Sequence, residues 1–217
     1  MQRRRRAALG REMLARLIYP VANPSLSYKF CKGYYARVAN GSMNGRVCRL
    51  LVPPLIRALK KVCGSDEYLD YLDSFHYPLA GEFAMQHDVI EDIRIPSDWG
   101  LEMGVLSEMQ RNYATNQICQ VDVADTYDHK HQDLSLEDRT RGLSKMSCDI
   151  TKSLYRKMAT QGQVFSYETV RTIKAAYYRI ALDLIESYNS DAAINGLKYD
   201  RHTEGSAVEV FAENILS

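Results

Sequence analysis

Two histidines separated by one residue are the first group in this sequence that could do chemistry. His129 and His131 stand in the stretch Tyr127-Asp-His-Lys-His-Gln132. Side chains two apart in an extended segment point to the same side, so both imidazoles could converge on one ion or anion. Three aspartates lie just upstream: Asp122, Asp125 and Asp128. Hard divalent ions prefer carboxylate oxygens. The alternative is a solvated acidic loop with structural histidines.

Two carboxylates in apolar, glycine-containing surroundings form the second group. Glu82 stands in Leu79-Ala-Gly-Glu-Phe-Ala84, and Glu102 stands in Trp99-Gly-Leu-Glu-Met-Gly104. A carboxylate among apolar neighbours must be paired or hydrogen-bonded, and active sites concentrate such groups. The alternative for both is a structural ion pair within the fold. Trp99 could stack on a sugar ring or anchor a core.

A glycine-led turn with an arginine is the third group. The stretch Asn44-Gly-Arg-Val-Cys-Arg49 precedes a helix pattern. Gly45 exposes backbone N–H groups, a helix start adds partial positive charge, and the planar guanidinium of Arg46 matches phosphate or carboxylate. The pattern predicts an anion clamp, although turns of this kind are also common on protein surfaces. Lys29 and Lys32 are interpreted as solvated charges on a strand.

These groups need elements to position them, and the apolar spacing predicts an α/β part up to residue 134 and a helical part after it. In the first part we expect a helix ended by Pro20, a second at 50–62 with Pro53-Pro54 in its first turn, and a short helix or turn at 66–75. Strands are predicted at 27–38, 79–85 and 117–123, a loop at 40–45, and a helix capped by Asp98. The second part predicts helices at 135–158, from Ser166 and from Glu204.

Composition excludes several classes of protein. A net charge of +1 argues against a broad nucleic-acid-binding face, and the basic run Arg3–Arg6 is interpreted as a solvated terminus. The five cysteines lack Cys-x-x-Cys spacing, which favours reduced thiols. No apolar run approaches about 18 residues, and no secretory signal is recognisable. We therefore expect a soluble, cytoplasmic protein that binds neither nucleic acid nor membrane.

Taken in order, several segments resemble the glucosyl-3-phosphoglycerate synthase family, retaining glycosyltransferases with the GT-A fold. The matching segments are 11–17 (Arg-Glu-Met-Leu-Ala-Arg-Leu), 19–24 (Tyr-Pro-Val-Ala-Asn-Pro), 30–37 (Phe-Cys-Lys-Gly-Tyr-Tyr-Ala-Arg), 45–47 (Gly-Arg-Val), 78–82 (Pro-Leu-Ala-Gly-Glu), 100–102 (Gly-Leu-Glu), 128–132 (Asp-His-Lys-His-Gln) and 191–202. The resemblance covers nearly all of the chain after residue 10 and implies transfer of glucose from a nucleotide sugar to 3-phosphoglycerate. It also implies Mg²⁺ or Mn²⁺ as the ion that holds the diphosphate. Glucose or mannose as the sugar, and a homodimer as the assembly, stay open.

The resemblance also implies roles for individual residues. Glu102 matches an acidic residue beside the acceptor and the donor sugar, and is the candidate catalytic residue. His129 matches the histidine that binds the metal ion. Four residues are candidates for binding the acceptor: Gly45, Arg46, Cys48 and His131. Cys48 stands where the family usually has a threonine that binds phosphate, so one hydroxyl contact is missing.

By this resemblance the chain divides into residues 1–10, which match nothing, an acceptor-side α/β part at 11–134 and a helical region at 135–217. The expected fold class is α/β, a partial GT-A fold comprising its acceptor half. No Asp-x-Asp motif occurs in the sequence. We therefore expect a fragment without the nucleotide-binding half and with weak or no transferase activity alone. The alternatives are a non-catalytic phosphoglycerate-binding or partner-dependent module and, third, a hydrolase with a metal at His129 and His131.

Overall fold

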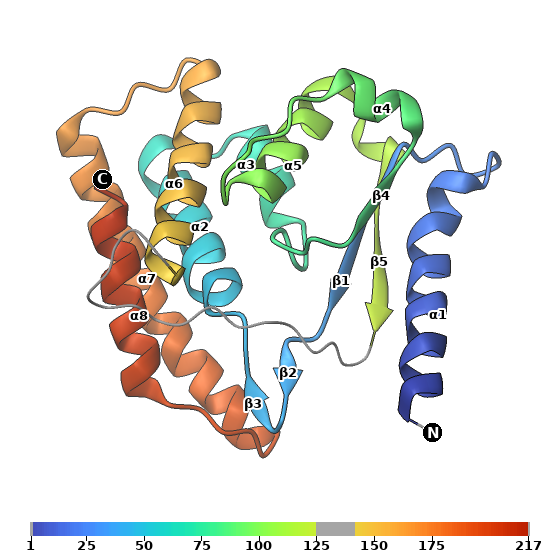
Figure 1. The fold of residues 1–217 in the computed structure, drawn as a ribbon. Coiled ribbons are helices and arrows are strands. Elements are labelled where there is room, and N and C mark those ends of the chain that lie inside the picture. Colours follow the sequence, from blue (N-terminus) through green and yellow to red (C-terminus); the bar gives the residue numbers. More distant parts are fainter. Residues whose placement is uncertain (1, 125–141, 217) are drawn as a thin grey trace.

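The computed structural model describes residues 2–124 and 142–216, and its centre is a three-stranded sheet with the order β4-β1-β5 (Figure 1). The middle strand β1 (Phe30–Tyr35) runs antiparallel to β4 (Phe83–Met85) and parallel to β5 (Ile118–Ala124). Helix α1 (Gln2–Ala22) covers one face of the sheet, where Leu17 packs with Cys31 and Val123. The other face turns toward the remaining helices, and Phe30 enters their core.

Helices α2 (Val52–Cys63), α6 (Gly142–Thr160), α7 (Tyr167–Ile194) and α8 (Arg201–Asn214) pack together on that side (Figure 1). Three further helices lie between the strands in sequence: α3 (Glu67–Asp73), α4 (His87–Asp92) and α5 (Leu101–Asn112). The buried Tyr177 of α7 donates its hydroxyl hydrogen to the Leu50 carbonyl oxygen at 2.7 Å, so this large side chain leaves no unpaired hydroxyl in the core.

A small hairpin and one irregular turn connect the sheet to α2. Strands β2 (Val38–Ala39) and β3 (Ser42–Met43) are joined by Asn40 and Gly41, which have φ values of 53° and 70°. Positive φ at both central residues suits the two-residue turns of hairpins, and asparagine and glycine tolerate it best. After the hairpin, the π-helical turn η1 (Val47–Leu51) leads directly into α2, whose first turn contains Pro53 and Pro54 as predicted.

Most of the predicted elements are confirmed, and the differences have local causes. Helix α1 passes Pro20 and ends at Ala22, because later residues still find acceptors: the Asn23 N–H donates to the Tyr19 carbonyl oxygen at 3.0 Å. The same helix begins at Gln2 and so includes most of the segment that matched nothing. The expected strand at 79–85 is shorter, because the chain first turns at 77–81, where the Ala80 N–H donates to the Tyr77 carbonyl oxygen at 3.2 Å. Asp98 bonds to the Gly100 N–H at 2.8 Å, just before α5, whose N-cap position is Gly100 itself.

Two helix starts expected from the sequence, at Asp66 and Ser166, are confirmed. Asp66 and Ser166 cap α3 and α7 with their side chains. Strands β1 to β5 all precede residue 125. In the described part from residue 142 on, the elements are the helices α6, α7 and α8. The five cysteines are free thiols. None of the described helices combines the length and apolar composition needed to span a bilayer. The start of the predicted helix at 135 lies outside the described residues.

Two helical glycines provide a test of the packing. A Cβ atom at Gly104 of α5 would lie 2.4 Å from Pro96 Cγ, whereas a Cβ at Gly205 of α8 would meet no atom within 4 Å. We expect Gly104→Ala to lower the free energy of unfolding by roughly 1–3 kcal/mol, because the rigid proline ring must move. Gly205→Ala, the matched control, should raise it by about 0.5–1 kcal/mol through helix propensity. Urea unfolding followed by circular dichroism measures both, and equal effects would contradict the close contact.

Candidate active site

A pocket of about 370 Å³ opens where the hairpin, η1, the 77–81 turn, α5 and α6 meet. Four of the candidate residues line it together: Gly45, Arg46, Cys48 and Glu102. Leu143, Met146 and Ile150 of α6 form an apolar wall, and Trp99 contributes a half-exposed indole. The structure therefore brings the predicted anion clamp and the glycine-flanked carboxylate to one small cavity.

Gly45 shapes the clamp through its backbone. Its φ is +75°, and a Cβ atom there would lie 3.3 Å from both Cγ and Nε of Arg37. The turn is held by the Asn44 N–H, which donates to the Arg37 carbonyl oxygen at 2.7 Å. A left-handed conformation combined with a close neighbour favours glycine over any other residue. This backbone geometry brings Arg37, which also lines the pocket, against the start of η1.

Arg46 and its neighbour Arg49 share one buried carboxylate. Arg46 Nε donates to Glu204 Oε1 at 3.0 Å, and Arg49 Nη2 donates to Glu204 Oε2 at 2.9 Å. Glu204 belongs to α8 and is only 3% exposed. Arg49 also donates to the Asn44 carbonyl oxygen at 2.9 Å, and its guanidinium lies 4.9 Å above the centre of the Tyr188 ring. Arg46 uses Nε in its ion pair, so the terminal nitrogens of its fork can still face the pocket.

Glu102 enters the pocket from the first turn of α5. An acidic side chain is favourable there because the helix N-terminus carries partial positive charge. Glu102 faces the 77–81 turn, because a Cβ atom at Gly81 would be in ordinary van der Waals contact with Glu102 Oε1, at 3.8 Å. Glu82, the second carboxylate considered from the sequence, is half-buried before β4 and does not line this pocket.

Cys48 presents a neutral thiol. Burial raises the pKa of this thiol to about 12, against smaller opposing effects from a hydrogen bond to the Leu79 backbone and from Arg37 and Lys32. At neutral pH the thiol is therefore protonated, a weak hydrogen-bond donor rather than a nucleophile.

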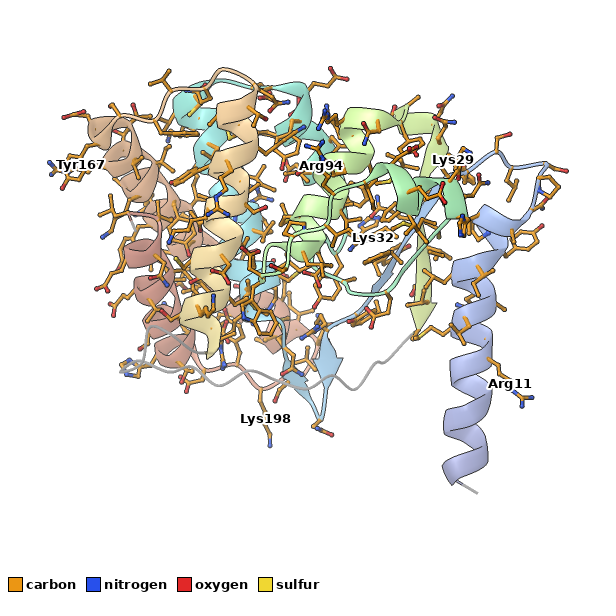
Figure 2. All side chains as sticks on the ribbon, turned by 45° about the horizontal axis from the view of Figure 1, so that its top comes forward. Arg11, Lys29, Lys32, Arg94, Tyr167 and Lys198 are labelled. Atoms are coloured by element: carbon orange, nitrogen blue, oxygen red, sulfur yellow. The ribbon has the colours of Figure 1, made fainter. Side chains whose placement is uncertain are left out.

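Lys32 corrects the interpretation made from the sequence. It is fully buried on β1 rather than solvated, and its ammonium donates to the Ala80 carbonyl oxygen and lies 5.4 Å above the centre of the Phe83 ring. Lys29 does reach the surface, where it pairs with Asp88. Figure 2 labels both lysines and places Lys32 among the central elements of the view. Alternation along β1 turns Lys32 to the same face as Phe30, toward the helical core.

Sequence reasoning missed two other residues. Arg37 donates to the Tyr77 hydroxyl oxygen, and its guanidinium lies 5.2 Å above the centre of that ring. Arg37 stands two residues beyond β1, and this position at the end of a strand was the available signal for a site residue. Glu204 carried no signal, because its partners Arg46 and Arg49 lie more than 150 residues away in the sequence.

The predicted metal site cannot be placed. His129, His131, Asp125 and Asp128 lie outside the described residues, and Asp122 is exposed on β5. Within 2–124 and 142–216, no group of three or more His, Cys, Asp or Glu side chains is arranged to hold a metal ion.

The shared carboxylate yields a stability prediction. We expect Glu204→Gln to lower the free energy of unfolding by about 3–5 kcal/mol, because it leaves two arginines without their buried countercharge. Glu209→Gln changes an exposed residue of the same helix and should stay within about 0.5 kcal/mol of the unchanged protein. Urea unfolding compares the two, and similar curves would show that the ion pair does not hold α8 in place.

No protein-family model matches the sequence. A curated glucosyl-3-phosphoglycerate synthase from Persephonella marina is 50% identical over 204 residues, which make up 94% of this chain and 50% of that protein. Another from Methanococcoides burtonii is 44% identical over 208 residues, again 94% of this chain and 50% of the relative.

Two solved structures share the fold. One is glucosyl-3-phosphoglycerate synthase from Mycobacterium tuberculosis in complex with Mn²⁺, UDP-glucose and phosphoglyceric acid, with a TM-score of 0.51, 20% identity, and coverage of 68% of this chain and 44% of that one. The other is mannosyl-3-phosphoglycerate synthase from Rubrobacter xylanophilus, with a TM-score of 0.54, 22% identity, and coverage of 71% and 44%. Both likenesses support a partial GT-A fold. By sequence, the chain is similar to the glucosyl-3-phosphoglycerate synthases, and it spans about half the length of the curated relatives that it matches.

Proposed function

We propose that this chain forms the acceptor side of a glucosyl-3-phosphoglycerate synthase, an enzyme that transfers glucose from a nucleotide sugar to 3-phosphoglycerate. The observation that carries the proposal is the single pocket lined by Gly45, Arg46, Cys48 and Glu102. The names of the curated relatives support the reaction, and the ligands of the Mycobacterium tuberculosis structure support the two substrates.

The pocket suits a small phosphorylated acid. Its volume of about 370 Å³ lies within the range of small-molecule sites. The Gly45–Arg46 turn offers N–H groups and a guanidinium to the phosphate, and Arg37 is a second cation for the carboxylate. Glu102 can then accept a hydrogen bond from the acceptor's hydroxyl group and orient its oxygen toward the sugar, which is the role of a catalytic residue.

The remaining assignments rest on the family resemblance. His131 would contact the acceptor, and His129 would bind Mg²⁺ or Mn²⁺, which supplies charge neutralisation for the departing diphosphate. The described residues do not fit a divalent-ion site by themselves, because such ions take several oxygen ligands and no such set is gathered there. A cytoplasmic location is compatible with the five free thiols. Assembly into a homodimer can be tested by light scattering, which measures the mass of the particle in solution.

We expect the chain alone to bind 3-phosphoglycerate but to transfer little or no glucose to it. It spans about half of each curated relative and contains no Asp-x-Asp motif. In the described part the sheet has three strands, with β4 and β5 at its edges. Open edges invite pairing with another polypeptide. These features favour, as second candidate, a phosphoglycerate-binding module that needs a nucleotide-binding partner.

A transfer assay separates the two candidates. We expect the purified 217-residue protein to give weak or no product with UDP-glucose, 3-phosphoglycerate and Mn²⁺ or Mg²⁺, while calorimetry detects 3-phosphoglycerate binding. The full-length Persephonella marina relative is the positive control. Robust turnover by the 217-residue protein would overturn the partner requirement, and absence of 3-phosphoglycerate binding would overturn the acceptor assignment.

Variants of the clamp test which residues hold the phosphate. Arg46→Ala should weaken 3-phosphoglycerate binding by about tenfold or more, since hydrogen bonds to charged groups contribute about 1.5–3 kcal/mol. Cys48→Thr should strengthen it by about threefold to tenfold, because a hydroxyl donates better than a thiol. Arg57→Ala removes an exposed arginine of α2 outside the pocket and should leave the affinity unchanged. Equal losses for Arg46→Ala and Arg57→Ala would point to nonspecific charge attraction.

A further inference from the structure

Lys32 lies behind the wall of the pocket rather than in it. The side chain is fully buried, and its neighbours on β1, Cys31 and Gly33, are buried as well. Its ammonium donates to the Ala80 carbonyl oxygen. Ala80 is followed directly by Gly81, which lines the pocket next to the Glu102 carboxylate. One hydrogen bond thus connects the buried cation to the turn that faces the candidate catalytic residue.

The countercharges of Lys32 come from two carboxylates. Burial opposes the protonated ammonium, while Glu102 of α5 and Glu82 before β4 favour it. A buried ammonium is costly unless acceptors and countercharges surround it. Glu102 is one of those countercharges, and a Cβ atom at Gly81, the residue after the carbonyl that Lys32 bonds, would lie 3.8 Å from Glu102 Oε1.

We propose that Lys32 is a positioning residue of the acceptor pocket: its ammonium fixes the Ala80–Gly81 turn and orients the Glu102 carboxylate toward the acceptor's hydroxyl group. The orientation of Glu102 toward the acceptor rests on the proposed function. The coupling between Lys32 and Glu102 is a property of the protein without a ligand. Lys32 does not touch the acceptor and acts through these two pocket elements.

The charge on Lys32 changes within an accessible pH range. Burial lowers the pKa of this lysine to about 8, with Glu102 and Glu82 opposing the decrease. The Cys48 thiol stays protonated in that range because its pKa is raised to about 12. Below pH 8 the ammonium form dominates, and above it the neutral amine does. Acceptor binding should therefore weaken between pH 7 and pH 9, where phosphate monoesters, with a pKa near 6, no longer change charge.

Titration of Lys32 tests the coupling without any ligand. In protein carrying ¹³C-labelled lysine Cε atoms, the Lys32 resonance is the one lost in Lys32→Met. We expect its titration midpoint near pH 8 to fall by about one pH unit in Glu102→Gln, because a nearby carboxylate stabilises the ammonium. Glu108→Gln, a change on the same helix, is the control and should leave the midpoint in place. An unchanged midpoint in Glu102→Gln would overturn the inference, whatever the protein binds.

Calorimetry tests whether Lys32 affects binding of the acceptor. 3-Phosphoglycerate should bind the unchanged protein several-fold more weakly at pH 9 than at pH 7, with proton uptake at pH 8 that varies with buffer ionisation heat. Lys32→Met should lose both effects, and Lys32→Arg, which stays charged, should lose the pH dependence but keep part of the affinity. If Lys32→Met does not fold, Lys32→Arg assigns the Lys32 resonance, and the proton uptake of the unchanged protein and the Glu102→Gln titration still decide. Coupling without 3-phosphoglycerate binding would leave the positioning geometry intact and overturn the proposed function alone.

Discussion

The buried carboxylate of Glu204 is the interaction on which the arrangement of the pocket depends. It accepts hydrogen bonds from Arg46 at 3.0 Å and from Arg49 at 2.9 Å, and so joins α8 to the turn that follows the hairpin. Two guanidiniums on adjacent sides of one turn would repel each other without it. The carboxylate supplies the missing countercharge, and the rings of Tyr188 and Tyr199 cover Arg49. The pair therefore ties the helical part of the chain to the site in the α/β part.

The hairpin reinforces this connection from the other side. Its tip meets the segment between α7 and α8, where the Lys198 N–H donates to the Gly41 carbonyl oxygen at 2.7 Å (Figure 1). The turn that carries Gly45 and Arg46 is thus held between the sheet and the last helix. A clamp built on a loop gains precision when the loop is fixed at both ends, because less conformational entropy is lost when a ligand binds. The helical region is a structural requirement of the pocket as well as a separate layer.

The cationic side chains at the pocket differ in their contact with solvent and therefore in what they can do. Arg37 and Arg46 line it and can meet an anion directly, whereas Lys32 is enclosed between the sheet and the pocket wall. A cation in contact with solvent exchanges hydration for ligand contacts, but an enclosed one has only its protein neighbours to compensate its burial. That difference explains why the arginines can recognise an acceptor while the lysine organises the residues around it.

Local signals in the sequence determined much of the secondary structure. Asp66 and Ser166 begin helices by bonding to N–H groups two or three residues on, and Asn40-Gly41 closes a hairpin, so a short window contains all the information needed. The segments that resemble one family, taken in their order along the sequence, likewise indicated the fold and the relatives. Tertiary structure alone decided that Lys32 is buried and that Glu204 pairs with Arg46 and Arg49. The spacing along a strand does not say which face a later helix will cover, and a partner more than 150 residues away leaves no pattern in the sequence around it.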